Sequence, residues 1–355
     1  MTPVPSIALD PIVAFLVGLL ETPSPTGYHE EAIAYVLSAL EKLGLEELAS
    51  WRTRKGALVV ALPGEHPDGA RALCAHVDTL GAMVRKIKRN GRLMLTQIGS
   101  YAWNAIEGEN VTIHCLADGR RYRGTVQTVT PSVHTSDQMR EGKRDDERME
   151  VRLDARTGSD EETAALGIAV GDLVFLDPRV ELTETGYIKG RHLDDKAGVA
   201  ALYGILHTLA AIKRRPARRT LFFFSNYEEV GHGAAVGIPQ EVEELLVVDM
   251  AASTTGEHQN SDEYSVGICA KDSTGPYDLA MRRKLVALCT RFEIPYRIDT
   301  YPHYGSDGSA FLRAGGDVRT ALIGPGVDAS HAYERTHRDS LEATIRLGLH
   351  YVLEP

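Results

Sequence analysis

Several short, strongly apolar runs in the sequence are each followed by acidic residues or a histidine. Residues 71–75 lead into His76, residues 220–225 contain Leu-Phe-Phe-Phe, and residues 245–249 end on Asp249. Continuous apolar runs of this length predict strands that are buried on both faces of a sheet. Loops that follow such strands meet at one edge of an open α/β sheet. The pattern therefore predicts an α/β fold with a polar site at that edge.

The composition is ordinary for a globular protein, and the charge balance is acidic. Of the 355 residues, 25% are charged and 43% hydrophobic, and the formal net charge is −10. A negative chain without long basic runs disfavours nonspecific binding to nucleic acid. The apolar residues 12–20 are too short to span a bilayer and lack the basic flank of a signal peptide. The four cysteines are scattered, which favours reduced, buried thiols. We expect a cytoplasmic protein with no nucleic-acid or membrane partner.

The middle of the chain differs from its two ends in the spacing of apolar and polar residues. Helical spacing predicts helices over residues 11–21 and 28–45. From Gly81 to about Tyr187, short alternating runs are separated by glycine and polar turns, which is typical of a small all-β module. Within that module, residues 132–148 are polar and show no periodicity, which predicts a mobile loop. Helix and strand patterns then alternate again.

We therefore predict an α/β domain with a central mixed sheet flanked by helices, interrupted by an inserted small β-barrel. The α/β domain comprises residues 1–80 and 186–355, and the barrel comprises residues 81–185. In the second half, the expected helices are 196–213, 277–292, 309–314 and 339–352, and the expected strands are 220–225, 245–249, 296–301 and 318–323.

His76 and Asp78 follow the first apolar run in a His-x-Asp pattern. Neutral imidazole is a common zinc ligand, and its second nitrogen usually donates to a carboxylate that fixes the tautomer. Asp78 is placed to be that carboxylate. A lone His-x-Asp is otherwise a turn at the end of a strand, so the pair predicts a metal site only together with further ligands.

Two pairs of adjacent carboxylates supply further candidates. Asp194 and Asp195 open a predicted helix, where one Asp serves as an N-cap. A second adjacent carboxylate repels the first unless a cation lies nearby. Glu228 and Glu229 follow the most hydrophobic strand, where one glutamate can bind metal while its neighbour acts as a base. An exposed acidic turn is the simpler alternative for that pair.

Asp249 and His337 complete the candidate set. Taken singly, Asp249 is a turn former after a strand, and His337 is a surface histidine before the last helix. Together with His76 and the two acidic pairs, they supply the ligands that two metal ions need. Zinc accepts these nitrogen and oxygen ligands, and cobalt or manganese also fits them, so the sequence predicts two divalent ions without fixing the metal.

Other catalytic motifs are incomplete or missing from the sequence. Residues 231–237 depart by one position from a dinucleotide-binding fingerprint, and the preceding glutamates would face the pyrophosphate. The sequence has no Walker-type phosphate loop and no Gly-x-Ser-x-Gly nucleophile elbow. Metal-assisted hydrolysis is therefore the favoured chemistry.

The combined motifs resemble those of metallopeptidase family forty-two, the di-zinc glutamyl and deblocking aminopeptidases that assemble as tetrahedral particles. The resemblance spans essentially the whole chain and rests on five motifs: Ala75-His76-Val77-Asp78-Thr79, Leu193-Asp194-Asp195-Lys196-Ala197-Gly198, Glu228-Glu229-Val230-Gly231, Val248-Asp249 and Arg335-Thr336-His337. It implies a zinc-exopeptidase-like domain with a PDZ-like barrel that supports dimerisation and larger assembly.

The resemblance also implies a role for each candidate residue. The metal ligands that it implies are Asp194 as a bridge between two ions, His76 and Asp249 at one ion, and Glu229 and His337 at the other. Glu228 resembles the general base that activates water between the two ions, and Asp78 resembles the residue that orients His76.

The sequence departs from the family pattern at two histidines. His232 stands where a nonpolar residue is usual, and His331 is an additional histidine six positions before His337. Both are candidates for the substrate pocket, together with Ser306 and Asp307. His331 is also an alternative to His337 as the last metal ligand, and a surface or helix-capping role is the simpler alternative for His232 and His331.

The resemblance implies hydrolysis of the N-terminal bond of a peptide or of a small amide, by a homo-oligomer between a dimer and a dodecamer. A narrower resemblance, over residues 192–199 and 328–337, is to peptidase-like proteins linked to synthesis of the osmolyte N-acetylglutaminylglutamine amide, which would favour a small amide. Two alternatives stay open. One is an endoglucanase-like glycosidase, which needs two carboxylates and no metal, and the other is a non-catalytic assembly protein built around the barrel.

Overall fold

The computed structural model describes residues 6–45, 47–253 and 258–355, which form two compact units. One unit joins Met1–Asp78 to Val180–Pro355, and the other is Thr79–Arg179. The divisions fall at 78/79 and 179/180, compared with 80/81 and 185/186 in the sequence prediction. The smaller unit is thus inserted directly after Asp78, at the carboxyl end of a strand.

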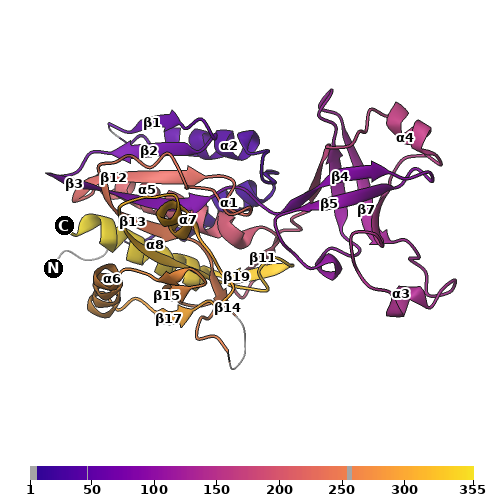
Figure 1. Cartoon of the computed structure of the whole chain (residues 1–355). Helices are drawn as coiled ribbons and strands as arrows, with labels where there is room; N and C mark the ends of the chain where they lie inside the picture. Colours follow the sequence, from indigo (N-terminus) through magenta and orange to yellow (C-terminus); the bar gives the residue numbers. More distant parts are fainter. Residues whose placement is uncertain (1–5, 46, 254–257) are drawn as a thin grey trace. The chain divides into compact units, whose positions relative to one another are not determined.

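The larger unit is built on a mixed sheet, to which thirteen strands of the described residues belong. Its main path is β1-β2-β12-β3-β13-β18-β19-β11-β10. The strands are β1 (Ala49–Arg52), β2 (Leu58–Leu62), β3 (His66–His76), β10 (Glu181–Leu182), β11 (Tyr187–Gly190), β12 (Arg218–Ser225), β13 (Val242–Val248), β14 (Ala251–Ser253), β15 (Val266–Asp272), β16 (Gly275–Pro276), β17 (Tyr296–Thr300), β18 (Arg319–Asp328) and β19 (Glu334–His337). At the centre, β12, β3, β13 and β18 run parallel, so their carboxyl ends lie at one edge (Figure 1).

Helices cover this sheet because successive strand residues face opposite sides. The helices are α1 (Leu9–Leu20), α2 (Glu30–Glu41), α5 (Leu193–Ile212), α6 (Leu279–Arg291), α7 (Asp307–Arg313) and α8 (Arg338–Leu353). Phe222 and Phe224 of β12 belong to the core that includes α1, α2, α5 and α8, whereas Leu221 and Phe223 belong to a second core on which Phe311 of α7 packs. The predicted α/β class with a mixed sheet is confirmed.

The smaller unit is a closed barrel in the strand order β4-β5-β8-β7-β6-β9. Its elements are β4 (Gly81–Ile87), β5 (Leu93–Ile98), η1 (Trp103–Ala105), β6 (Asn110–His114), β7 (Arg121–Thr128), α3 (Gln138–Glu141), β8 (Met149–Leu153), α4 (Asp160–Ala165) and β9 (Leu173–Leu176). Inward residues such as Leu95, Val151 and Val174 form a core of its own. The polar stretch 132–148, predicted as a loop, contains the single turn α3, and Arg144 pairs with Glu107 at 2.7 Å.

All four cysteines are buried and outside any disulfide, as predicted. In the described ranges, no helix has both the length and the apolar character that crossing a bilayer requires.

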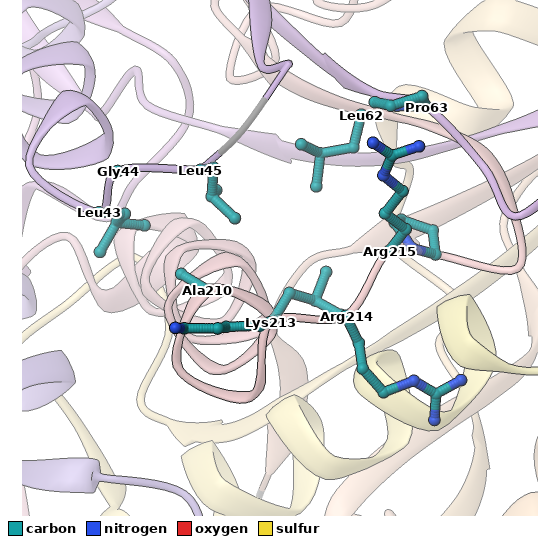
Figure 2. A pocket seen from close by; sticks show the side chains of 11 residues that line it. Leu43, Gly44, Leu45, Leu62, Pro63, Ala210, Lys213, Arg214 and Arg215 are labelled. Carbon is teal, nitrogen blue, oxygen red and sulfur yellow. The ribbon is translucent and has the colours of Figure 1, made fainter.

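A hollow of about 390 Å³ lies where the loop after α2, the end of β2 and the turn after α5 meet. Figure 2 shows Leu45 and Leu62 directed into this space, with Lys213 and Arg215 at its border.

Candidate metal centre

The carboxyl edge of the central strands collects the predicted ligands. His76 is the last residue of β3, Asp249 directly follows β13, and Glu228 and Glu229 lie three and four residues beyond the end of β12. Asp194 is in the first turn of α5. His76, Asp194 and Asp249 each offer one ligand atom, and these atoms lie within 4.8 Å of one another, with all three residues buried.

Asp194 lies between two histidines, one at each carboxylate oxygen. Its Oδ1 is 3.3 Å from His76 Nε2, and its Oδ2 is 3.3 Å from His331 Nε2. The same nitrogen of His331 is 3.7 Å from Glu229 Oε2, and His76 Nε2 is 3.8 Å from Glu228 Oε2. A hollow of about 220 Å³ opens over this cluster. The carboxylate of Asp194 thus lies between the two histidines, with one oxygen near each ring.

The structure does not bring His337 to this cluster. Because β19 pairs antiparallel with β11, His337 stands opposite Tyr187, and its ring packs edge-on against Tyr187 and Tyr264. Its Nε2 is 2.9 Å from the Thr185 carbonyl oxygen, and its Nδ1 accepts the Asp339 N–H as the N-cap of α8. Both nitrogens of the predicted ligand are engaged elsewhere, and His331 occupies the place expected for it.

Asp78 contacts His76 differently from the prediction. His76 Nδ1 is 2.9 Å from the backbone carbonyl of Asp78, whereas the closest carboxylate oxygen is 3.6 Å away. The carboxylate instead accepts the N–H groups of Glu228 and Glu229, at 3.1 and 3.3 Å, and the hydroxyl of Thr26. Asp78 therefore fixes both the His76 ring and the turn that carries the two glutamates.

The three other pocket candidates lie in different places. Ser306 lines the hollow over the cluster. Asp307 does not line it, because its buried carboxylate accepts hydrogen bonds from the Ser225 hydroxyl, the Cys74 thiol and the Ala234 N–H. His232 lies outside this hollow and lines a neighbouring one, where its ring stacks on Tyr227.

Two residues around the cluster, Glu334 and Tyr304, were not singled out from the sequence, and Asp195 was named there only as the neighbour of Asp194. Glu334 accepts the N–H groups of Asp194 and His331 with its two oxygens, at 3.2 and 3.0 Å. Its position three residues after His331 is the one signal that the sequence offered. Asp195 accepts the N–H of His76 at 3.2 Å, and Tyr304 lines the hollow.

Glycine is required at position 198, where α5 approaches β13 closely. A Cβ there would lie 2.2 Å from Asp195 Oδ1 and 2.5 Å from the Val248 carbonyl oxygen. The Gly198 N–H donates to that same Asp195 oxygen. The glycine of the Asp194-to-Gly198 motif thus allows the first turn of α5 to lie against the ends of the strands.

The charges of the cluster are not balanced by the protein alone. Burial, together with the charge of Asp194, raises the pKa of Asp249 to about 7 and also raises the pKa of Glu229. Burial opposes a charged ring at His76, but its hydrogen bond to Asp194 and the charge of Glu228 raise the pKa of His76. Glu229 Oε1 is buried and has no hydrogen-bond partner among the described residues. Divalent cations would relieve this repulsion and satisfy that oxygen, so the donor set fits them.

Comparison with known proteins identifies the family of the chain. The sequence model of the M42 glutamyl aminopeptidases matches residues 56–347. The chain belongs to the M42 glutamyl aminopeptidase family. Membership makes it a hydrolase that acts on peptides, which confirms the predicted family and enzyme class. The narrower resemblance to the osmolyte-linked subgroup stays a prediction.

Relatives of this M42 chain match it over nearly its whole length. The YhfE protein of Bacillus subtilis (strain 168), a proposed aminopeptidase, is 46% identical over 337 residues, which are 95% of this chain and 96% of YhfE. The aminopeptidase APDkam598 from Desulfurococcus kamchatkensis has a TM-score of 0.86 at 20% identity, over 98% of this chain and 96% of that chain. The Pyrococcus horikoshii TET1 peptidase, which assembles into a tetrahedron or a large octahedral shell, has a TM-score of 0.83 at 20% identity, over 97% and 100% of the two chains.

Proposed function

We propose that this M42 protein is a metal-dependent aminopeptidase that removes the N-terminal residue from peptides or hydrolyses small amides. The observation that carries the proposal is the position of Asp194, with one oxygen facing His76 and the other facing His331. A carboxylate shared in this way is the usual bridge in two-metal hydrolytic sites.

In this proposal Asp194 would serve two divalent ions. His76 and Asp249 would hold the first ion, because their ligand atoms cluster with that of Asp194. His331 and Glu229 would hold the second ion, since His331 Nε2 lies near an oxygen of Asp194 and of Glu229. This assignment replaces His337 with His331 as the last ligand. Zinc suits the donor set, and cobalt or manganese also fits it.

When bound, such ions polarise a carbonyl and lower the pKa of water. Glu228 is the proposed base, which takes a proton from the attacking water and delivers it to the departing amine. Burial raises the pKa of Glu228 above the ordinary value of a glutamate, which suits a group that must both accept and release a proton. The hydrogen bond from its N–H to Asp78 holds its backbone in place.

The two alternatives from the sequence account less well for these contacts. A glycosidase needs a pair of carboxylates on either side of a sugar, and it has no use for histidines at both oxygens of Asp194. An assembly protein has no use for a buried cluster whose carboxylates repel one another. Association into a homo-oligomer is part of the proposal, supported by the assembly of the TET1 relative, and so is a cytoplasmic location.

The test is an assay of aminoacyl-p-nitroanilides and short amides before and after removal of metal. We expect chelation to abolish turnover, and zinc, cobalt or manganese to restore it at two ions per subunit. Full activity in the metal-free protein, or activity on glucans instead of peptides, would overturn the proposal.

A further inference from the structure

A second hollow, of about 680 Å³, lies beside the metal centre. The turn at residues 227–232 contributes to both hollows, because Glu228, Glu229 and Gly231 line the first and Tyr227 and His232 line the second. The second hollow therefore shares with the metal centre the turn that carries the proposed base.

The opposite wall of this hollow is the tip of the β1–β2 hairpin, residues 53–56. The tip is closed by the Gly56 N–H, which donates to the Thr53 carbonyl at 3.0 Å. Asn226 Nδ2 donates to the Lys55 carbonyl at 2.8 Å, and Lys55 Nζ donates to the carbonyls of His232 and Gly233. The hairpin tip is therefore fastened to the turn that carries the catalytic glutamates.

Three Arg and Lys side chains line this hollow against one carboxylate, although the whole chain has a net charge of −10. Arg52, Arg54 and Lys55 line it, and its carboxylate Glu30 is already paired with Arg52 at 3.1 Å. Arg54 makes no hydrogen bond or ion pair with any residue that the structure describes. An exposed guanidinium without a partner, held on a fastened turn, is available to a ligand anion.

Two aromatic rings, those of Tyr227 and His232, also line this hollow. The rings of Tyr227 and His232 stack with centroids 5.2 Å apart and planes 19° apart. Lys55 Nζ lies 5.5 Å from the centre of the Tyr227 ring. Aromatic side chains of this kind can pack against the apolar parts of a peptide, while the cations beside them favour a negative group.

We propose that this hollow is a subsite for a carboxylate of the peptide substrate, with Arg54 as its main cation and His232 in its wall. The inference rests on the proposed aminopeptidase function and adds a feature of its substrates: a negative charge beyond the cleaved bond, on the side of the peptide's C-terminus. The carboxylate is either an Asp or Glu side chain or the free C-terminus of a short peptide, and the substrates of the test separate the two sources.

The test compares matched substrates that differ in one charge. An Ala-Ala-Glu peptide is compared with Ala-Ala-Gln, both with amidated C-termini, and Ala-Ala-Ala as the free acid is compared with its amide. For the wild type we expect the charged member of at least one pair to have a kcat/KM higher by roughly three- to tenfold, mainly through KM, because one exposed charge-assisted contact contributes about this much.

Substitution of Arg54 then tests the assignment. In Arg54→Gln the ratio of the two kcat/KM values should fall to about one, in Arg54→Lys part of the preference should remain, and in Arg54→Glu it should reverse. The matched control is Arg283→Gln, which removes an exposed cation of α6 that lines none of these hollows and should leave the ratio at its wild-type value. Thermal unfolding of each variant checks that the fold is retained.

Binding measured without turnover separates this inference from the proposed function. Calorimetric titration of the same peptides into Glu228→Gln should show the same preference for the charged members. A preference in binding, together with a metal-loaded wild type that hydrolyses none of these peptides, would overturn the proposed function and keep the subsite. Two results would overturn the subsite and keep the proposed function. One is equal binding of charged and neutral peptides. The other is a ratio of kcat/KM for charged over neutral peptides that changes to the same extent in Arg54→Gln and in Arg283→Gln.

Discussion

The helix α5 begins at one charged cluster and ends at another, and the two differ in burial. At its first turn, Asp194 and Asp195 are 6% and 0% exposed and lie among further buried carboxylates. After its last turn, residues 213–215 are three exposed cations beside the hollow of Figure 2. There, Arg215 pairs with Glu47 at 2.8 Å, and Arg214 lies 3.6 Å from Glu65.

This difference decides what each cluster indicates. The exposed cations remain hydrated, complement the carboxyl end of the helix and contribute at most about 1 kcal/mol each. The buried carboxylates have lost water and repel one another, and burial is the largest cause of the raised pKa of Asp195, Glu229 and Asp249. Of these two clusters, only the buried one therefore needs a ligand of opposite charge to relieve its repulsion.

The largest effect that this comparison predicts is at Glu228. Glu228→Gln removes the proposed base but no proposed metal ligand, so kcat should fall about 10²- to 10⁴-fold while the metal stays bound. Steady-state kinetics and metal analysis of the same preparation measure both quantities. Glu65→Gln, at the other end of α5, is the matched control and should keep wild-type kcat. Wild-type turnover in Glu228→Gln would show that the base lies elsewhere.

The second prediction separates the two histidines. His331→Ala should lower metal affinity by at least about 10- to 100-fold, the loss typical even for residues that only support a ligand. His337→Ala should keep the metal and instead lower the free energy of unfolding by about 1 kcal/mol, because it removes the N-cap of α8. Competition with a chelator measures the affinity, and denaturant unfolding measures the stability. The reverse result would restore His337 as the ligand.

His331 and His337 show which parts of the site the sequence could predict and which it could not. The sequence placed His76, Glu229 and Asp249 at one edge because apolar runs fix where strands end, and parallel strands bring those ends together, whereas Asp194 was a candidate because an acidic pair opens a predicted helix. The path from β18 to β19 has no such signal. Ala329 and His331 adopt positive φ, at 58° and 64°, a conformation that their residue types rarely take. This turn directs His331 to the cluster and leaves His337 in the register of β19.

Asp78 illustrates a second limit of the sequence. A His-x-Asp spacing places both residues at the end of β3, and the spacing alone suggests that the carboxylate orients the ring. Which acceptor the ring uses depends on Glu228 and Glu229, whose N–H groups occupy the Asp78 carboxylate. Contacts between segments 150 residues apart in the sequence follow from the packed fold, and local pattern does not encode them.

The third prediction concerns pH and metal-free protein. The folded pKa of Asp249, about 7 without metal, lies above its ordinary value of 3.8. The folded state therefore binds more protons than the unfolded state between these values, and this contribution to stability is lost as pH rises from about 4 to 7. The loss is at most about 1.4 kcal/mol per pH unit for one proton. Thermal unfolding with chelator should show a midpoint that falls across this range.

Added metal should abolish that dependence, because metal binding requires the deprotonated carboxylate. His337→Ala is the control with the cluster intact, and it should show the same fall as the wild type. A midpoint of the metal-free protein that rises between pH 4 and 7 would contradict buried, mutually repelling carboxylates at the first turn of α5.

The smallest effect is expected at the last turn of α5. Arg215→Gln removes one of the cations beside the hollow of Figure 2 and its pairing with Glu47. Both partners are about half exposed, so water replaces the lost contact, and the free energy of unfolding should change by less than about 1 kcal/mol. Metal content, kcat and KM should stay at wild-type values, since the cations at this end of α5 are hydrated and need no ligand to stabilise them. A change in metal content or turnover would mean that exposed charge also shapes the site, and burial would then no longer distinguish the two ends of the helix.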